Sequence, residues 1–98
     1  MVINQKKEGT TLNIALEGRL DTMTSPQLEG VLGENLNGVT EVIFDFAKLE
    51  YISSAGLRVL LSTQKIMDKQ GKMELTNVCD EIMEVFNITG FSEFLTIK

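Results

Sequence analysis

The order in which strand-type and helix-type patterns follow each other is the feature that most constrains the fold of this chain. Strand-type segments carry apolar residues at every second position or in short runs, and helix-type segments carry them three or four positions apart. The predicted strands are residues 2–7, 11–17, 41–46, 72–78 and 93–98, and the predicted helices are residues 24–36, 53–70 and 80–90. This order, β-β-α-β-α-β-α-β, predicts an α/β fold with right-handed crossovers. We expect a mixed, mainly parallel sheet with an edge strand from the opening hairpin, covered largely on one side by helices.

The predicted strand 41–46, EVIFDF, is nearly continuous in apolar and aromatic residues. That pattern is typical of a central strand whose two faces are both covered. We interpret residues 47–52, AKLEYI, as the link from this strand to the next helix. Asp45 is unexpected in the strand, because a charge among apolar residues is costly unless it is paired or lies at the margin.

Several classes of function are excluded by residues that the chain lacks. It has no histidine, which removes Ser-His and Cys-His catalysis and most zinc sites, and its single cysteine, Cys79, excludes an internal disulfide and a multi-cysteine metal site. No phosphate-binding glycine loop of the GxxxxGK[ST] or GxGxxG type occurs. The basic residues are scattered and the net charge is −5, which argues against nucleic acid as a partner. We therefore expect a protein that is not an enzyme and has neither a cofactor nor a bound metal.

The length of 98 residues predicts a single domain, residues 1–98, with one core. Uncharged stretches are far shorter than the roughly 20 apolar residues of a membrane-spanning helix. The N-terminal lysines are not followed by an apolar run, so we expect no signal peptide, no membrane association and a cytoplasmic protein.

The segment 51–62, YISSAGLRVLLS, places two adjacent serines where a strand gives way to a helix. One hydroxyl, from Ser53 or Ser54, could cap the helix by accepting a hydrogen bond from an unpaired N–H group. The second hydroxyl goes beyond that need, and Gly56 leaves the backbone bare, so a partner protein could approach the start of the helix. From the residues alone, capping and a functional hydroxyl both remain open. Asp21 follows the second strand and could either face a ligand at the carboxyl end of the sheet or cap a turn.

Three segments together resemble the STAS family, and within it the bacterial anti-sigma factor antagonists (anti-anti-sigma factors). They are ALEGRLDTMTSPQLE, VIFDFAKLEYISSAGLRVLL and the tail GKMELTNV followed by EVFNITGF, and they cover essentially the whole chain in order. The resemblance implies the STAS fold and a role in partner switching that regulates transcription. The unphosphorylated protein binds an anti-sigma factor that is also a serine kinase, and so releases the sigma factor. Phosphorylation by that kinase ends the binding, and a metal-dependent serine phosphatase restores it.

The resemblance also assigns roles to residues of this chain. The serine two positions before the motif's glycine is the phosphorylation site, which is Ser54 here. Ser53 stands where several relatives carry Asp, so a hydroxyl replaces a fixed charge. The implied partner-binding residues are Asp21, Thr22, Ser53, Ser54, Ala55, Gly56, Leu57 and Arg58. An alternative is a STAS partner subunit of a lipid or anion transporter. A serine-dependent hydrolase is disfavoured, because no histidine is available to activate the hydroxyl.

Overall fold

A computed structural model describes residues 1–98, which form a five-stranded sheet and three α-helices. In chain order the elements are β1 (Val2–Glu8), β2 (Thr11–Leu20), α1 (Ser25–Asn35), β3 (Glu41–Ile52), α2 (Ser54–Gln70), β4 (Lys72–Thr76), α3 (Asp80–Thr89), the 3-10 helix η1 (Phe91–Glu93) and β5 (Thr96–Ile97). The strands lie in the order β1-β2-β3-β4-β5. Only β1 is antiparallel to its neighbour, and the other strand pairs are parallel. The predicted α/β order and the antiparallel edge hairpin are confirmed.

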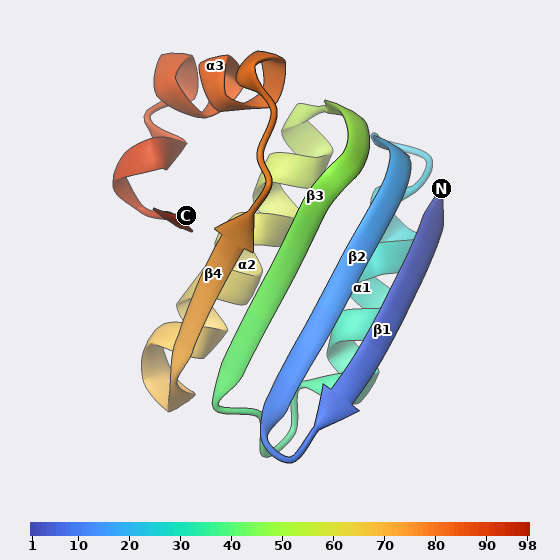
Figure 1. Ribbon diagram of the computed structural model, residues 1–98, viewed down its shortest axis with the longest axis vertical. Coiled ribbons are helices and arrows are strands. Elements are labelled where there is room, and N and C mark those ends of the chain that lie inside the picture. The colour runs from blue at the N-terminus through green and yellow to red at the C-terminus, as the bar shows by residue number, and fades with distance from the viewer.

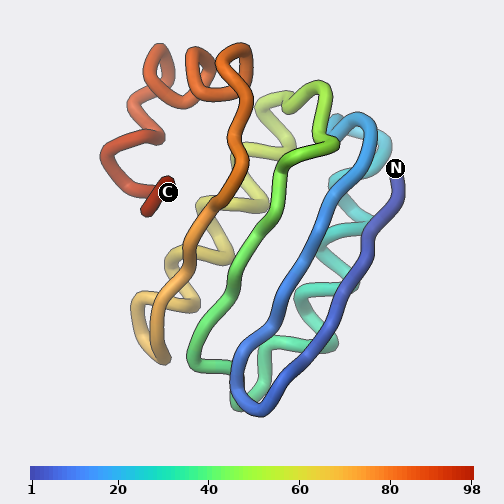
Figure 2. The backbone as a smooth tube through the Cα atoms, viewed as in Figure 1, coloured from blue at the N-terminus to red at the C-terminus, as the bar shows by residue number.

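Helices α1 and α2 pack behind the sheet, and the opposite face of the sheet is open (Figures 1 and 2). Buried and partly exposed residues alternate along the strands, as expected for a sheet with one covered face. On β2, Leu12, Ile14 and Leu16 are buried, whereas the residues between them are partly exposed. The prediction that both faces of the segment 41–46 are covered is wrong, because Ile43 and Asp45 lie on the open face and are only half-buried.

Strand β3 is longer than predicted and continues through the residues that were interpreted as a link. Ala15 of β2 pairs with Asp45, but Glu17 pairs with Lys48, so β3 carries an extra residue between these pairs. Such a β-bulge shifts the side chains between faces. A second extra residue follows between Leu49 and Tyr51, which pair with Gly18 and Arg19. From the first bulge on, the buried residues of β3 are three positions apart, at Phe46, Leu49 and Ile52. The loss of alternation is the reason why the sequence pattern did not indicate a strand here.

The C-terminal part of the chain also differs from the prediction in its element boundaries. Strand β4 ends at Thr76, one residue before Asn77, which adopts the left-handed conformation with φ of 56°. The N-cap of helix α3 is Cys79, and Asp80 lies in its first turn. The predicted strand 93–98 is reduced to the two residues of β5, because η1 occupies the chain up to Glu93.

One core of 22 buried apolar residues joins the sheet to all three helices. Helix α3 lies across the end of the sheet beyond β4 (Figure 1), and it contributes Ile82 and Phe86 to this core. None of the helices combines the length and the apolar character that crossing a membrane requires.

Candidate functional site

The carboxyl ends of β2 and β3 bring the two predicted site segments together. The backbone N–H of Ser53 donates a hydrogen bond to the carbonyl of Leu20, at 2.9 Å. This bond links the start of α2 to the end of β2. The loop that begins at Asp21 and the first turn of α2 are therefore neighbours, although they lie some thirty residues apart in sequence.

The two adjacent serines have different roles in the structure. Ser53 is the N-cap of α2, in extended conformation, and its hydroxyl accepts a long hydrogen bond of 3.5 Å from the N–H of Gly56. Ser54 is the first residue of the helix, and its side chain is exposed. Because Ser53 meets the capping need, the hydroxyl of Ser54 is left without a role in the fold.

Gly56 has a different role from the one that the sequence suggested. It is buried, and a Cβ atom at this position would lie 2.8 Å from Cγ of Leu20 and 2.9 Å from Cγ1 of Ile52. The glycine therefore lets α2 pack closely on the two strand ends, and it does not open the helix to a partner. Leu57 is also buried, with 5% of its surface exposed. Of the eight predicted partner-binding residues, these two face the core and can act only by positioning the helix.

The loop after β2 is organised around Asp21. One oxygen of its carboxylate accepts hydrogen bonds from the backbone N–H groups of Met23, at 3.0 Å, and Thr24, at 3.1 Å. Burial raises the pKa of Asp21, but these bonds, the Thr24 hydroxyl and the Arg19 guanidinium together lower it below its usual value. The Thr24 hydroxyl donates to the carbonyl of Arg19 at 2.8 Å. Thr24 is the N-cap of α1, but its side chain makes no capping hydrogen bond to the helix, because it is used inside this loop.

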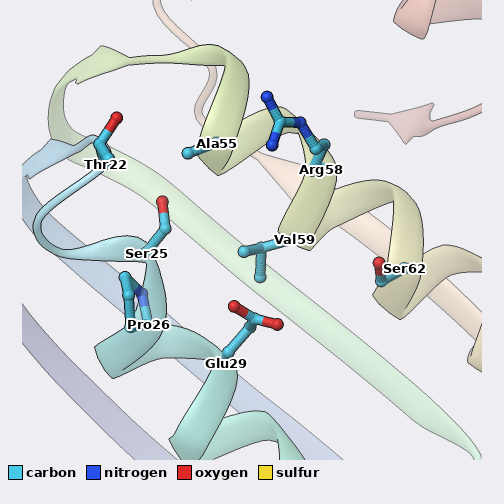
Figure 3. A pocket seen from close by; sticks show the side chains of 8 residues that line it. All are labelled: Thr22, Ser25, Pro26, Glu29, Ala55, Arg58, Val59 and Ser62. Atoms are coloured by element: carbon cyan, nitrogen blue, oxygen red, sulfur yellow. The ribbon is translucent and has the colours of Figure 1, made fainter.

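A polar groove of about 310 Å³ runs between the N-terminal halves of α1 and α2 (Figure 3). Its charged members are Glu29 on α1 and Arg58 on α2, and neither takes part in an ion pair. The lining residues are Thr22, Ser25, Pro26, Glu29, Ala55, Arg58, Val59 and Ser62. Three of the predicted site residues therefore line this one groove: Thr22, Ala55, which follows Ser54 in the chain, and Arg58.

Sequence reasoning missed three exposed side chains at the carboxyl ends of β2 and β3 and in the loop after β2. Met23 is 87% exposed in the loop after β2, and Tyr51 is 41% exposed near the end of β3. The guanidinium of Arg19 stacks over the Tyr51 ring, 4.1 Å from its centroid, and its Nε lies 3.6 Å from Asp21 Oδ2. Exposed aromatic, Met and Arg residues are enriched at protein interfaces. The sequence did contain one signal for Met23, which is an apolar residue within the polar loop DTMTSP.

Asp45 does not belong to this site. It lies on the open face of the sheet, well before the carboxyl end of β3. Its carboxylate accepts hydrogen bonds from the Asn77 side chain, at 3.0 Å, and from the N–H of Ala47, at 2.9 Å. These two bonds lower the pKa of Asp45. The charge of Asp45 is hydrogen-bonded by two neutral groups, one of which is an N–H group at the bulge of β3.

Comparisons with known proteins agree on one family. A family model described as STAS domain matches residues 2–98. The chain is 36% identical over 93 residues to BtrV of Bordetella bronchiseptica, which is named as a candidate anti-sigma factor antagonist; the match covers 93% of this chain and 80% of the relative. An anti-sigma factor antagonist from Mycobacterium paratuberculosis has a similar structure, with a TM-score of 0.87, 18% identity and coverage of 98% of this chain and 83% of that one. Unphosphorylated SpoIIAA, an anti-sigma factor antagonist, is similar with a TM-score of 0.79, 20% identity and coverage of 99% and 87%.

Proposed function

Because this chain belongs to the STAS domain family, we propose that it is an anti-sigma factor antagonist in a partner-switching system. The unphosphorylated form binds an anti-sigma factor that is also a serine kinase, and thereby releases the sigma factor in the cytoplasm. Phosphorylation of Ser54 ends this binding, and a metal-dependent serine phosphatase restores it. The chain itself acts by binding and does not catalyse a reaction. The observation that carries the proposal is the exposed Ser54 hydroxyl, which the fold does not use, beside the groove between α1 and α2.

The division of labour between the serines supports Ser54 as the phosphorylation site. The Ser53 hydroxyl caps α2, so its modification would disturb the helix start. Ser54 can enter a kinase active site without breaking a contact of the fold. In the transfer, Oγ of Ser54 bonds to the γ-phosphorus of ATP and the bond to ADP breaks. The hydroxyl proton passes to a basic group of the kinase.

The position of Ser54 also explains how phosphorylation could block binding without unfolding the protein. A phosphoserine adds about −1.5 to −2 charges and three acceptor oxygens. The N-terminus of a helix favours an anion, so α2 tolerates the phosphate. An interface shaped for a small hydroxyl does not tolerate it, because a bulky dianion must then be desolvated. A coupling of about 3 kcal/mol suffices for a loss of more than a hundredfold in affinity.

A transporter partner subunit has less support than this role. The relative that is 36% identical carries an antagonist name.

We assign the binding of the anti-sigma factor to residues near the start of α2 and in the loop after β2. They are Asp21, Thr22, Ala55 and Arg58, together with the exposed Met23 and Tyr51.

The test uses candidate anti-sigma kinases of the same organism, with ATP, on the wild type, Ser54→Ala and Ser53→Ala. We expect mass spectrometry to place one phosphate on Ser54 in the wild type and in Ser53→Ala, and none in Ser54→Ala. Calorimetry should show that the unphosphorylated protein binds the kinase and that phosphorylation weakens binding by about 100-fold or more. Phosphate on Ser53, or equal affinities of the two forms, would contradict the proposal.

A further inference from the structure

We propose that Arg58 is the intramolecular counter-ion of phosphorylated Ser54, an inference that rests on the proposed phosphorylation of that residue. By pairing with the phosphate, Arg58 leaves the groove between α1 and α2. Phosphorylation would then act twice at the interface, because it adds a dianion and withdraws the one basic side chain that lines the groove.

The spacing of the two residues on α2 places them within reach. Ser54 and Arg58 are four positions apart in a continuous helix, so they share a face, with Cβ atoms about 5–6 Å apart. An anionic residue that precedes a cationic one by four positions is the favourable order, since it agrees with the helix dipole. Figure 3 shows the Arg58 side chain extending back towards the turn of α2 that carries Ala55, and away from Ser62. The guanidinium therefore already lies on the side from which it can meet a phosphate.

Neither residue has a competing partner within the fold. The Ser54 side chain and the Arg58 side chain are both exposed, and Arg58 belongs to none of the five ion pairs. The first turn of α2 contains no acidic residue, so a phosphate would be its first negative charge. The other cation near this end of the sheet, Arg19, is engaged with Tyr51 and Asp21. Arg58 is thus the basic side chain that is free to respond.

The pairing changes the electrostatics of the groove. In the unphosphorylated protein, Glu29 and Arg58 line it with opposite charges, and the guanidinium is available to a carboxylate of the partner. When Arg58 turns to the phosphate, the charge that remains in the groove is that of Glu29. A partner acid that had faced Arg58 would lose its counter-ion and meet a like charge. This is the regulatory consequence of the pairing.

The test measures the second pKa of the phosphate, which is about 6 in a free phosphoserine. Phosphoserine is inserted at position 54 during translation, so no kinase is needed, and ³¹P NMR follows the titration of the full chain. A nearby guanidinium stabilises the dianion and lowers this pKa. We expect the pKa in the wild-type background to lie about 0.15 to 0.4 of a pH unit below that in Arg58→Gln, with Arg58→Lys in between. The Nε–H signal of Arg58 should move in the same pH range.

Lys65→Gln provides the matched control. It removes one positive charge from the same helix, about 16 Å further along the axis from Ser54, and Lys65 takes part in none of the ion pairs. We expect Lys65→Gln to titrate like the wild type. Equal pKa values in the wild-type and Arg58→Gln backgrounds would overturn the inference, and so would an equal shift in Lys65→Gln. Failure of the kinase to modify Ser54 would be seen separately, in the phosphorylation assay, and would refute the proposed function instead.

Discussion

At the scale of single residues, two serine side chains have different hydrogen-bonding roles because one lies before the start of α2 and the other within it. Ser53 and Ser54 are adjacent, but one lies just outside α2 and the other just inside it. The outer hydroxyl can reach the N–H of Gly56, whereas the inner one points away from the fold. A shift of the helix start by one residue would exchange these roles. The site therefore depends on the cap as much as on the serine that we expect to be modified.

This difference predicts the effects of two alanine substitutions on stability. Ser53→Ala removes the cap of α2, and we expect a loss of about 0.5–1 kcal/mol in the free energy of unfolding, at the low end of the range for caps because the bond is long. Ser54→Ala should change the free energy by less than about 0.5 kcal/mol, as for other exposed positions. Urea unfolding followed by circular dichroism measures both. A larger loss for Ser54→Ala than for Ser53→Ala would show that the cap is assigned to the wrong residue.

Asp45 gives a second prediction at this scale. Asp45→Ala removes the acceptor of the bonds from Asn77 and Ala47, and we expect a loss of about 1–2 kcal/mol at neutral pH. Asp45→Asn, which keeps an acceptor oxygen, should lose less. Guanidinium unfolding measures the two free energies.

The same position should show a defined pH dependence. The Asn77 amide and the Ala47 N–H lower the pKa of Asp45 in the folded state below that in the unfolded chain. Its contribution is therefore complete above the unfolded value of about 3.9, and it disappears as the pH falls through the lower folded value. The stability difference between the wild type and Asp45→Ala should shrink as the pH is lowered towards 3. A difference that grows on acidification would contradict this assignment.

At the scale of elements, close packing fixes the start of α2 against the ends of two strands. The backbone bond from Ser53 to Leu20 and the contact of Gly56 with Leu20 and Ile52 hold the helix at the carboxyl edge of the sheet. Two irregularities in β3 each add one residue relative to β2, and Ile52 pairs with Leu20 at this edge. The irregularities of β3, the close packing at Gly56 and the cap at Ser53 together place Ser54 beside the loop that begins at Asp21.

Two glycine substitutions test this packing. Gly56→Ala places a methyl group against Leu20 and Ile52 at less than 3 Å, and we expect a net loss of about 1–3 kcal/mol in the free energy of unfolding. Gly33→Ala is the matched control in α1, because its methyl group would meet no atom within 4 Å. It should stabilise the protein by up to about 1 kcal/mol through helix propensity. Thermal unfolding compares them, and a stabilising Gly56→Ala would show that α2 does not need this close approach.

At the scale of the whole molecule, one core joins the site to the C-terminal helix. Phe86 of α3 is completely buried and belongs to the same cluster as Leu20 and Ile52, which lie beneath the start of α2. The start of α2 and the C-terminal helix α3 should therefore unfold together, in one cooperative transition.

Phe86→Ala tests whether the molecule is one cooperative unit. We expect a loss of about 3–5 kcal/mol in the free energy of unfolding, from the lost burial and the cavity left behind. The fluorescence of Tyr51, the single tyrosine, reports on the site, and far-UV circular dichroism reports on all helices. Both signals should shift to the same new midpoint in urea. Loss of helical signal at a urea concentration that leaves Tyr51 unchanged would mean that α3 unfolds on its own.

The sequence by itself determined the order of elements, the antiparallel edge hairpin and the placement of the two serines at the start of α2. These features follow from hydrophobic periodicity and from caps, which act over a few neighbouring residues. Only the tertiary structure decided how far β3 extends, what Gly56 does and which side chains line the groove with Arg58. Each of these depends on residues far apart in the chain, such as Leu20 with Gly56 or Glu29 with Arg58. Periodicity contains no information about such contacts, because it describes each segment before its neighbours are in place.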